Sequence, residues 1–209
     1  MKAVNTGDEK LSLSEVNMDY YRFYDTDLYG IEEYDIIGEE YRRLIETCCK
    51  YSTVLALSMV NFGEEIIHFD ELDKFKIRSV RHIIKINRAE VLNKEIVYYR
   101  VCPELCKILV NYVDSIFKWV HTSEFSNPED LTFFREDGTV FFSSCIHEGV
   151  LTLCPQNEDV SEILKNPLWI NSKNDERWKT FGYVETSIDE TDFLEEMTFG
   201  KSRDEDCLK

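Results

Sequence analysis

The 209-residue sequence predicts a single α+β domain, in which a mostly antiparallel sheet with a C-terminal three-stranded meander packs against two or three helices. Two segments place apolar residues at helical spacing, and an apolar run of strand length follows the first of them. Residues 131–154 alternate apolar and polar side chains around two turn signals. We expect the domain to span residues 19–184, between a flexible lead (1–18) and an acidic tail (185–209).

The first predicted helix covers residues 39–51 and carries acidic residues in its first turn, where the helix dipole favours negative charge. Its apolar residues at helical spacing are Tyr41, Leu44, Ile45 and Cys48. The apolar run that follows predicts a buried strand over residues 54–62. Residues 64–93 fit either a strand or a helix, whereas β-branched and aromatic side chains predict a strand over residues 95–101.

The second predicted helix covers residues 103–120. Pro103 suits its first position, because proline lacks the N–H that would be unsatisfied there. One apolar stripe predicts the buried side of this helix, and it consists of Leu105, Leu109, Tyr112, Ile116 and Val120. A short helix is expected over residues 160–165, ended by Pro167.

The meander is predicted from Asp137-Gly138 and Glu148-Gly149, which are typical of two-residue hairpin turns. Two tight turns would pair Phe134 with Phe141, Phe133 with Phe142, Ile146 with Leu151 and Cys145 with Thr152. One face then collects Leu131, Phe133, Val140, Phe142, Ile146, Leu151 and Leu153. The opposite face is mixed and includes Cys145, His147 and Cys154.

The net charge of −17 arises from 24 basic and 41 acidic residues, and it is unevenly placed. Residues 1–41 hold 3 bases and 11 acids. Because phosphate binding requires a basic surface, we expect no direct binding of nucleic acid. The longest apolar run is too short to span a bilayer and no apolar signal segment follows Met1, so we expect a cytoplasmic protein without membrane contact. Seven cysteines, an odd number, argue against a disulfide framework.

A segment rich in tyrosine and acidic residues is the predicted partner-binding surface. Tyrosine offers a large, rigid contact area at low entropic cost, and surrounding carboxylates favour a basic protein. The predicted contact residues are Tyr20, Tyr21, Tyr24, Asp25, Asp27, Tyr29, Glu32, Glu33 and Tyr34. The main functional hypothesis is therefore a non-catalytic binding module, an immunity or inhibitor-like protein that occludes a basic partner.

Two alternatives remain open from the sequence. Cys145 and His147 share a predicted sheet face, so a cysteine- or metal-dependent hydrolase is one alternative, although their spacing is marginal for a nucleophile and its base. An acidic nucleic-acid mimic is the other. Residues 25–36 begin like a calcium loop but have isoleucine where the bidentate glutamate belongs. We expect no metal and no cofactor, and the oligomeric state is left open.

A block within residues 95–153 resembles a widespread group of small, mostly uncharacterised bacterial proteins. The block consists of Phe117-Lys118-Trp119, Pro128-Glu129-Asp130-Leu131, Asp137-Gly138 and His147-Glu148, which gives the pattern W…PEDL-x-F…G…HE. Some similar small acidic proteins accompany polymorphic toxins as immunity proteins. The resemblance therefore implies a toxin as the basic partner, and it brings no catalytic residue to any position of this sequence.

Overall fold

The computed structural model describes residues 19–27, 29–61, 69–86, 89–120 and 127–175. The predicted lead (1–18) and acidic tail (185–209) lie outside these residues. In the part described, the chain forms β1 (Tyr21–Tyr24), α1 (Gly38–Tyr51), β2 (Val54–Asn61), β3 (Lys76–Ile86), β4 (Ala89–Arg100), α2 (Pro103–Tyr112), β5 (Glu129–Phe134), β6 (Val140–Cys145), β7 (Val150–Leu153) and β8 (Ile170–Asn171). Short 3₁₀ turns are η2 (Asp70–Phe75), η3 (Ile116–Lys118), η4 (Ile146–Glu148) and η5 (Ser172–Asn174).

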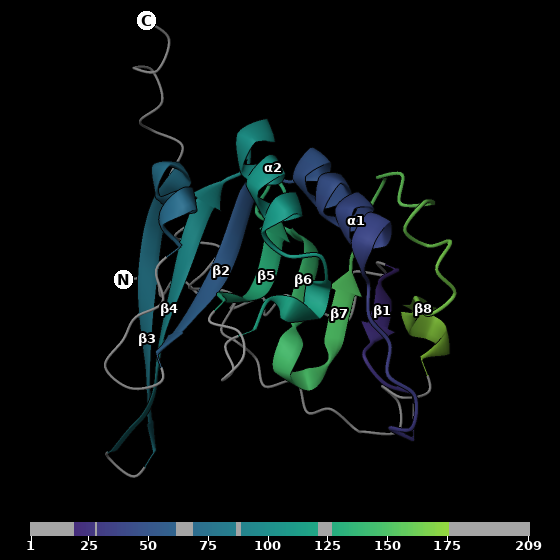
Figure 1. Ribbon diagram of the computed structural model, residues 1–209, viewed down its shortest axis with the longest axis horizontal. Helices are drawn as coiled ribbons and strands as arrows, with labels where there is room; N and C mark the ends of the chain where they lie inside the picture. Colours follow the sequence, from purple (N-terminus) through teal and green to yellow (C-terminus); the bar gives the residue numbers. More distant parts are fainter. Residues whose placement is uncertain (1–18, 28, 62–68, 87–88, 121–126, 176–209) are drawn as a thin grey trace, which may run out of the picture.

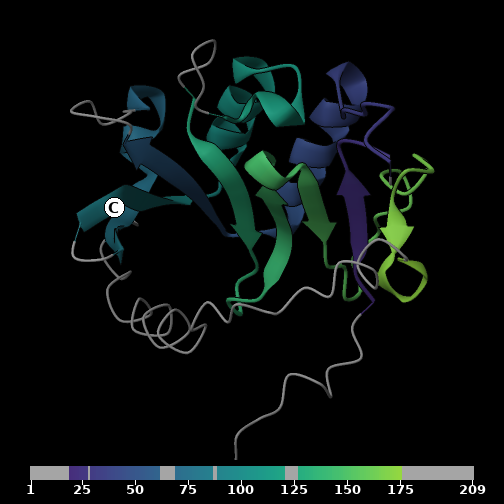
Figure 2. The same cartoon turned by 90° about the horizontal axis from the view of Figure 1, so that it is seen from below.

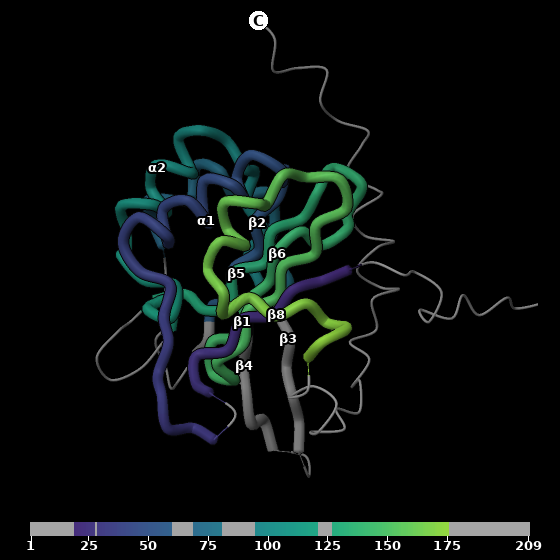
Figure 3. The backbone as a smooth tube through the Cα atoms, turned by 90° about the vertical axis from the view of Figure 1, so that its right-hand side faces the viewer, coloured from purple at the N-terminus to yellow at the C-terminus, as the bar shows by residue number. Residues whose placement is uncertain are grey.

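The described strands form one antiparallel sheet in the order β3-β4-β2-β5-β6-β7-β1-β8. Helices α1 and α2 cover the same face of this sheet (Figures 1 and 2). Viewed from the β8 edge, helices and sheet make two layers (Figure 3). The predicted α+β class is confirmed. None of the helices described is long and apolar enough to cross a membrane.

The main core lies between the helices and the sheet. Inside it, hydrogen bonds of Tyr41 and Trp119 link α1 to α2 and to the segment that follows α2. Tyr41 of α1 is 1% exposed, and its hydroxyl donates to the Leu109 carbonyl of α2 at 2.8 Å. The indole Nε1 of Trp119, which is fully buried, donates to the same hydroxyl at 3.0 Å. These two bonds satisfy polar groups that would otherwise be buried without partners, so they fix how α1 and α2 pack.

The helix predicted over residues 103–120 is wrong in length, because α2 ends at Tyr112. Beyond it the chain is extended and pairs with the segment before α1, through an isolated bridge between Ile37 and Ser115. With this pairing, Ile116 is buried beside the segment before α1 instead of along the buried side of a longer α2. The predicted helix at residues 160–165 is only a turn, closed by Ile163 and Leu164 N–H groups donating to the Val160 carbonyl.

The meander is confirmed, but both predicted turns are wrong. Gly138 has φ +85° while Asp137 does not have a positive φ, so the β5–β6 turn is not the predicted two-residue type I′ turn. The resulting bulge pairs Phe134 with Val140 instead of Phe141. Phe141 therefore enters the main core, where its ring lies 5.7 Å from that of Tyr51. Val140 moves to the opposite face.

The strand β1 was not anticipated, since its residues belong to the segment predicted as an exposed surface. It pairs with β7 on one side and β8 on the other. Phe23 points into the main core and is fully buried. On the opposite face, the hydroxyl of Tyr24 donates to buried Asp175 at 2.7 Å, and Arg22 lies 3.4 Å from the same carboxylate. Burial and this hydrogen bond raise the pKa of Tyr24.

Candidate functional site

The chain leaves β1 as a closed loop, Asp25–Tyr34, which we call the acidic loop and which projects from one corner of the molecule (Figure 1). Its two arms are bonded to each other. The Tyr34 N–H donates to the Asp25 carbonyl at 2.5 Å, and the Asp27 N–H donates to the Glu32 carbonyl at 3.0 Å. These bonds close the loop at two levels.

The Asp27 side chain organises the turn inside the acidic loop. Its Oδ1 accepts hydrogen bonds from the N–H groups of Ile31 at 2.6 Å and Glu32 at 3.3 Å. Gly30, at φ +67°, supplies the left-handed residue that this turn requires. The bond from Ile31 lowers the pKa of Asp27, so its carboxylate stays ionised at neutral pH and is occupied within the loop.

The loop tip exposes two large apolar side chains beside two carboxylates. Tyr29 is 80% exposed and Ile31 is 79% exposed, the largest exposed fractions among the large hydrophobic residues described. Glu32 and Glu33 are exposed next to them. We call these four residues the tip residues. This combination resembles a protein–protein interface in composition, because such interfaces place aromatic and aliphatic side chains at the centre and charged side chains around them.

The structure places the other predicted contact residues in supporting positions. Tyr24 is 8% exposed and bonded to Asp175, so it belongs to the fold rather than to an exposed surface. Tyr20 lies under the guanidinium of Arg22, and Tyr21 is half-buried in β1. The hydroxyl of Tyr34 donates to Glu32 at 2.6 Å.

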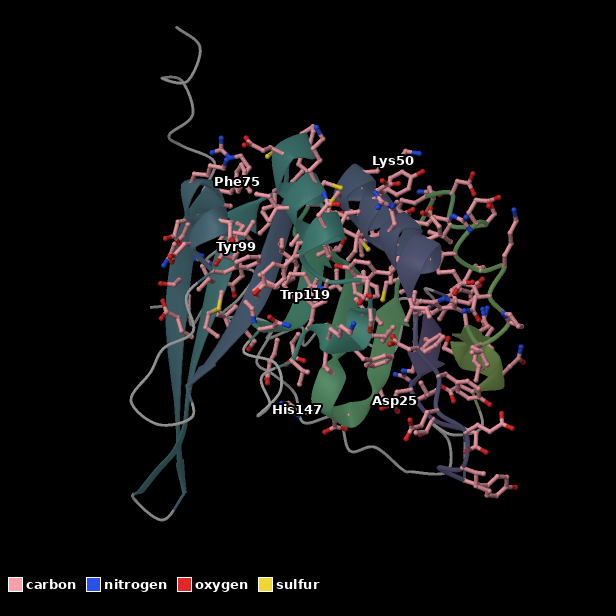
Figure 4. All side chains as sticks on the ribbon, viewed as in Figure 1. Asp25, Lys50, Phe75, Tyr99, Trp119 and His147 are labelled. Atoms are coloured by element: carbon pink, nitrogen blue, oxygen red, sulfur yellow. The ribbon has the colours of Figure 1, made fainter. Side chains whose placement is uncertain are left out.

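Asp25 fixes the base of the acidic loop to the η4 turn. Its N–H donates to the Gly149 carbonyl at 2.8 Å. The Asp25 carboxylate packs so closely that a Cβ atom on Gly149 would lie 2.0 Å from Asp25 Oδ1. Asp25 and His147 consequently lie at the same end of the molecule (Figure 4).

His147 pairs with Glu129. Its Nε2 lies 2.8 Å from Glu129 Oε1, and the Glu129 side chain is only 2% exposed while that of His147 is 54% exposed. The β6–β7 register places Cys145 opposite Val150 instead of the predicted Thr152. Residues 146–148 therefore leave the strand as η4, and His147 does not share a sheet face with Cys145 as predicted.

The carboxylates of Glu129 and Asp130, at this end of the sheet, make hydrogen bonds within the fold. Among the described residues, no group of three or more His, Cys, Asp or Glu side chains is placed to hold a metal ion. Asp130, in the left-handed region at φ +53°, uses its Oδ1 to accept the Ile146 N–H at 3.0 Å. Its carboxylate thus stabilises the η4 turn, and Glu129 orients His147.

A hollow of about 240 Å³ lies between α1 and residues 160–169. Its floor is apolar and its rim is charged, but the rim charges pair with each other. Glu162 lies 2.5 Å from Lys165 and 3.9 Å from Arg43. The volume is below the range of about 300–1,000 Å³ typical of small-molecule sites. We therefore take the tip residues, rather than this hollow, as the candidate site.

No protein-family model, curated protein or solved structure gave a significant match to this chain. The resemblance of residues 95–153 to small bacterial proteins stays an expectation. Sequence reasoning missed Ile31 and Glu129. A signal for Ile31 was present, since it stands between a glycine and two glutamates. Glu129 could be connected to η4 only after the β5–β6 register was known.

Proposed function

We propose that this protein is a non-catalytic binding module, and that the tip residues Tyr29, Ile31, Glu32 and Glu33 contact a basic protein partner. The observation that carries the proposal is the exposure of Tyr29 and Ile31 beside Asp27, whose carboxylate accepts hydrogen bonds from the Ile31 and Glu32 N–H groups. Burying such side chains against a partner contributes roughly 1.5–3 kcal/mol each. A segment that is already hydrogen-bonded before binding has less entropy to lose on binding, so more of this contribution is retained.

The charge of the partner follows from the charges around the tip. Glu32 and Glu33 flank the apolar pair, and the chain as a whole carries −17. A cationic surface would be attracted over a distance of about 8–10 Å at ordinary ionic strength, which speeds encounter. The resemblance of residues 95–153 makes a toxin the first class of basic partner to test.

Two double variants separate the contributions of the tip. Glu32→Lys with Glu33→Lys reverses the charge, and Tyr29→Ala with Ile31→Ala removes the apolar contact. Asp25 and Asp27 are left unchanged, because they hold the loop together. The matched control reverses two exposed glutamates remote from the loop in sequence, Glu46→Lys with Glu136→Lys, and gives the same net charge.

The experiment captures partners from a bacterial lysate on the immobilised protein, then titrates the purified partner by calorimetry against each variant. We expect a basic partner whose Kd weakens at least tenfold, about 1.4 kcal/mol, for both tip variants and less than twofold for the control. Thermal stability should remain within a few degrees of the wild type. Retention of an acidic partner, or equal weakening in the control, would contradict the proposal. Displacement of the partner by DNA would favour the nucleic-acid mimic instead.

A further inference from the structure

The sheet carries a second apolar cluster on the face turned away from the helices. Helices α1 and α2 lie on the other face (Figures 1 and 2). The buried residues of this cluster, which we call the outer cluster, are Ala56, Tyr98 and Phe134, and partly buried side chains such as Val54 and Ile96 pack against them. A sheet face open to water usually carries polar side chains. An apolar cluster there therefore indicates that a further segment packs over it.

Strand pairing connects the outer cluster to the place where the described chain ends. Residues directly opposite each other in neighbouring strands share a sheet face. Such partners run from β4 to β1 in one row, which consists of Tyr98, Ala56, Thr132, Ser143, Thr152 and Arg22. At the Arg22 end of this row lies Asp175, which accepts hydrogen bonds from Arg22 and Tyr24. The described chain thus ends on the face that carries the outer cluster.

The chain beyond Asp175 is long enough to reach the outer cluster. Neighbouring strands lie about 4.8 Å apart, so the four steps in the row from Arg22 to Ala56 measure about 19 Å. Residues 176–187 can span up to about 40 Å when extended. A segment that begins near residue 187 can therefore lie over the outer cluster.

Residues 187–200 lie outside the described part of the chain, and their sequence is typical of one short helix. Ser187 and Glu190 match the capping box found at helix N-termini. Gly200 matches the glycine that often follows the last turn of a helix. The sequence therefore predicts a helix over residues 188–199.

This predicted helix has an apolar side and an acidic side. Helical spacing places Phe193, Leu194 and Met197 on one side. It places Asp192, Glu195 and Glu196 on another. Residues 185–199 hold six acids and no base. A helix of this length is only marginally stable alone in water, so it needs a surface on which to bury its apolar side.

Basic side chains lie beside the outer cluster. The guanidinium carbon of Arg78 lies 4.9 Å from the centre of the Tyr98 ring. Arg100 is exposed and is the strand partner of Val54, so it shares the face of the outer cluster. An acidic helix is attracted to these charges, whereas a second copy of the same face would bring arginine against arginine. The charges therefore favour the acidic segment of this chain as the occupant.

We propose that residues 187–200 dock as an amphipathic helix over the outer cluster, with Phe193, Leu194 and Met197 against the sheet. Helices then cover both faces of the sheet. The tip residues take no part in this contact, so the inference goes beyond the proposed binding function and does not depend on it.

Photo-crosslinking of the full chain tests where the segment lies. p-Benzoylphenylalanine replaces Phe193, the protein is irradiated at high dilution, and tryptic peptides of the monomer are analysed by mass spectrometry. We expect cross-links to the peptides 51–74 and 95–100, which contain β2 and the end of β4. The same probe at Leu208, beyond the predicted helix, is the matched control and should not enrich these peptides. Cross-links to α1 or α2, cross-links between two molecules, or no cross-link to the sheet would overturn the proposal.

Hydrogen exchange measures the same contact without a probe. The amides of residues 188–199 should exchange about tenfold more slowly in the wild type than in Leu194→Ser with Met197→Ser, because the undocked segment does not keep its helix. Leu208→Ser is the matched control and should leave this exchange unchanged. Exchange in the wild type as fast as in the double variant would overturn the proposal.

A charge reversal tests the attraction between the segment and the sheet. Arg100→Glu should speed exchange of residues 188–199 by roughly threefold, because it replaces an attraction by a repulsion at an exposed position. Arg42→Glu makes the same change of charge at an exposed position of α1, on the helix side of the sheet, and should have no effect. Equal effects of the two substitutions would overturn the choice of this face.

Discussion

Replacing Glu158 by glutamine should destabilise the fold strongly at pH 7 and much less at pH 3. Glu158 pairs with Arg135, and their side chains are only 12% and 9% exposed. Arg135 also donates to the Val140 carbonyl at 2.6 Å and to the Cys154 carbonyl. The Glu158 carboxylate accepts the Gln156 N–H at 2.6 Å. This network joins the β5–β6 turn to the chain that follows β7.

The magnitude follows from the pKa of Glu158. Burial alone raises that pKa, but the hydrogen bonds from Arg135 and from the Gln156 N–H outweigh burial and lower it from 4.5 to about 2. A folded-state pKa below the unfolded one stabilises the protein above pH 4.5, and this stabilisation is lost as the pH falls towards 2. The shift corresponds to about 3 kcal/mol at pH 7 and about 1.4 kcal/mol at pH 3.

Urea unfolding of the wild type and of Glu158→Gln at both pH values measures these differences. Glutamine keeps the shape and the acceptor of a protonated glutamate, so the difference in unfolding free energy should fall from about 3 to about 1.4 kcal/mol between pH 7 and pH 3. Glu162→Gln is the matched control. Glu162 is also paired but is 56% exposed, and such pairs contribute at most about 1 kcal/mol. Equal losses in the two variants, or a Glu158→Gln loss that does not change with pH, would refute the reasoning.

Three further substitutions test other contacts. Gly149→Ala should lower the unfolding free energy by about 2 kcal/mol, because it combines a left-handed φ with a clash against Asp25, and Asp25→Ala in the same chain should restore part of it in urea unfolding. Tyr41→Phe should cost about 1–3 kcal/mol, since it leaves buried hydrogen-bond partners unsatisfied, and calorimetry should show a lower Tm. His147→Ala should change the alkylation rate of Cys145 by iodoacetamide less than twofold, and a large decrease would revive the cysteine-hydrolase alternative.

Local sequence patterns predicted those helices and strands whose formation depends on residues close together in the chain. The apolar spacing of Tyr41 to Cys48 predicted α1, and its bounds agree within one residue at the N-terminal end. Pro103 marked the start of α2 correctly. The end of α2 was not predicted, because Ile116 continues the helical spacing but is buried by a bridge to residues before α1. A contact between segments so far apart has no trace in local spacing.

The residues of the candidate site were likewise predicted only in part from the sequence. Composition predicted an exposed Tyr29 among carboxylates, but it did not predict the burial of Tyr24. Both residues belong to the same tyrosine-rich run. Tyr24 is buried because it lies in β1, which pairs with β7, whereas Tyr29 lies beyond that strand. The alternation of side chains across a strand decides which tyrosines face inward, and that alternation begins only where a strand begins. Composition does not encode where β1 begins, and so it does not encode which tyrosines face inward.

The amino-acid sequence alone predicts the α+β class, the acidic character of the segment before α1 and the meander at residues 131–154, since periodicity, charge and turn residues are local properties. Long-range packing was needed to see that His147 lies beside Glu129 rather than on the sheet face of Cys145, and that the Tyr41 hydroxyl of α1 bonds to the Leu109 carbonyl of α2. Both outcomes depend on strand register and helix packing. Those are set by the burial of side chains from distant segments, whose free energies favour one arrangement only when the whole core is assembled.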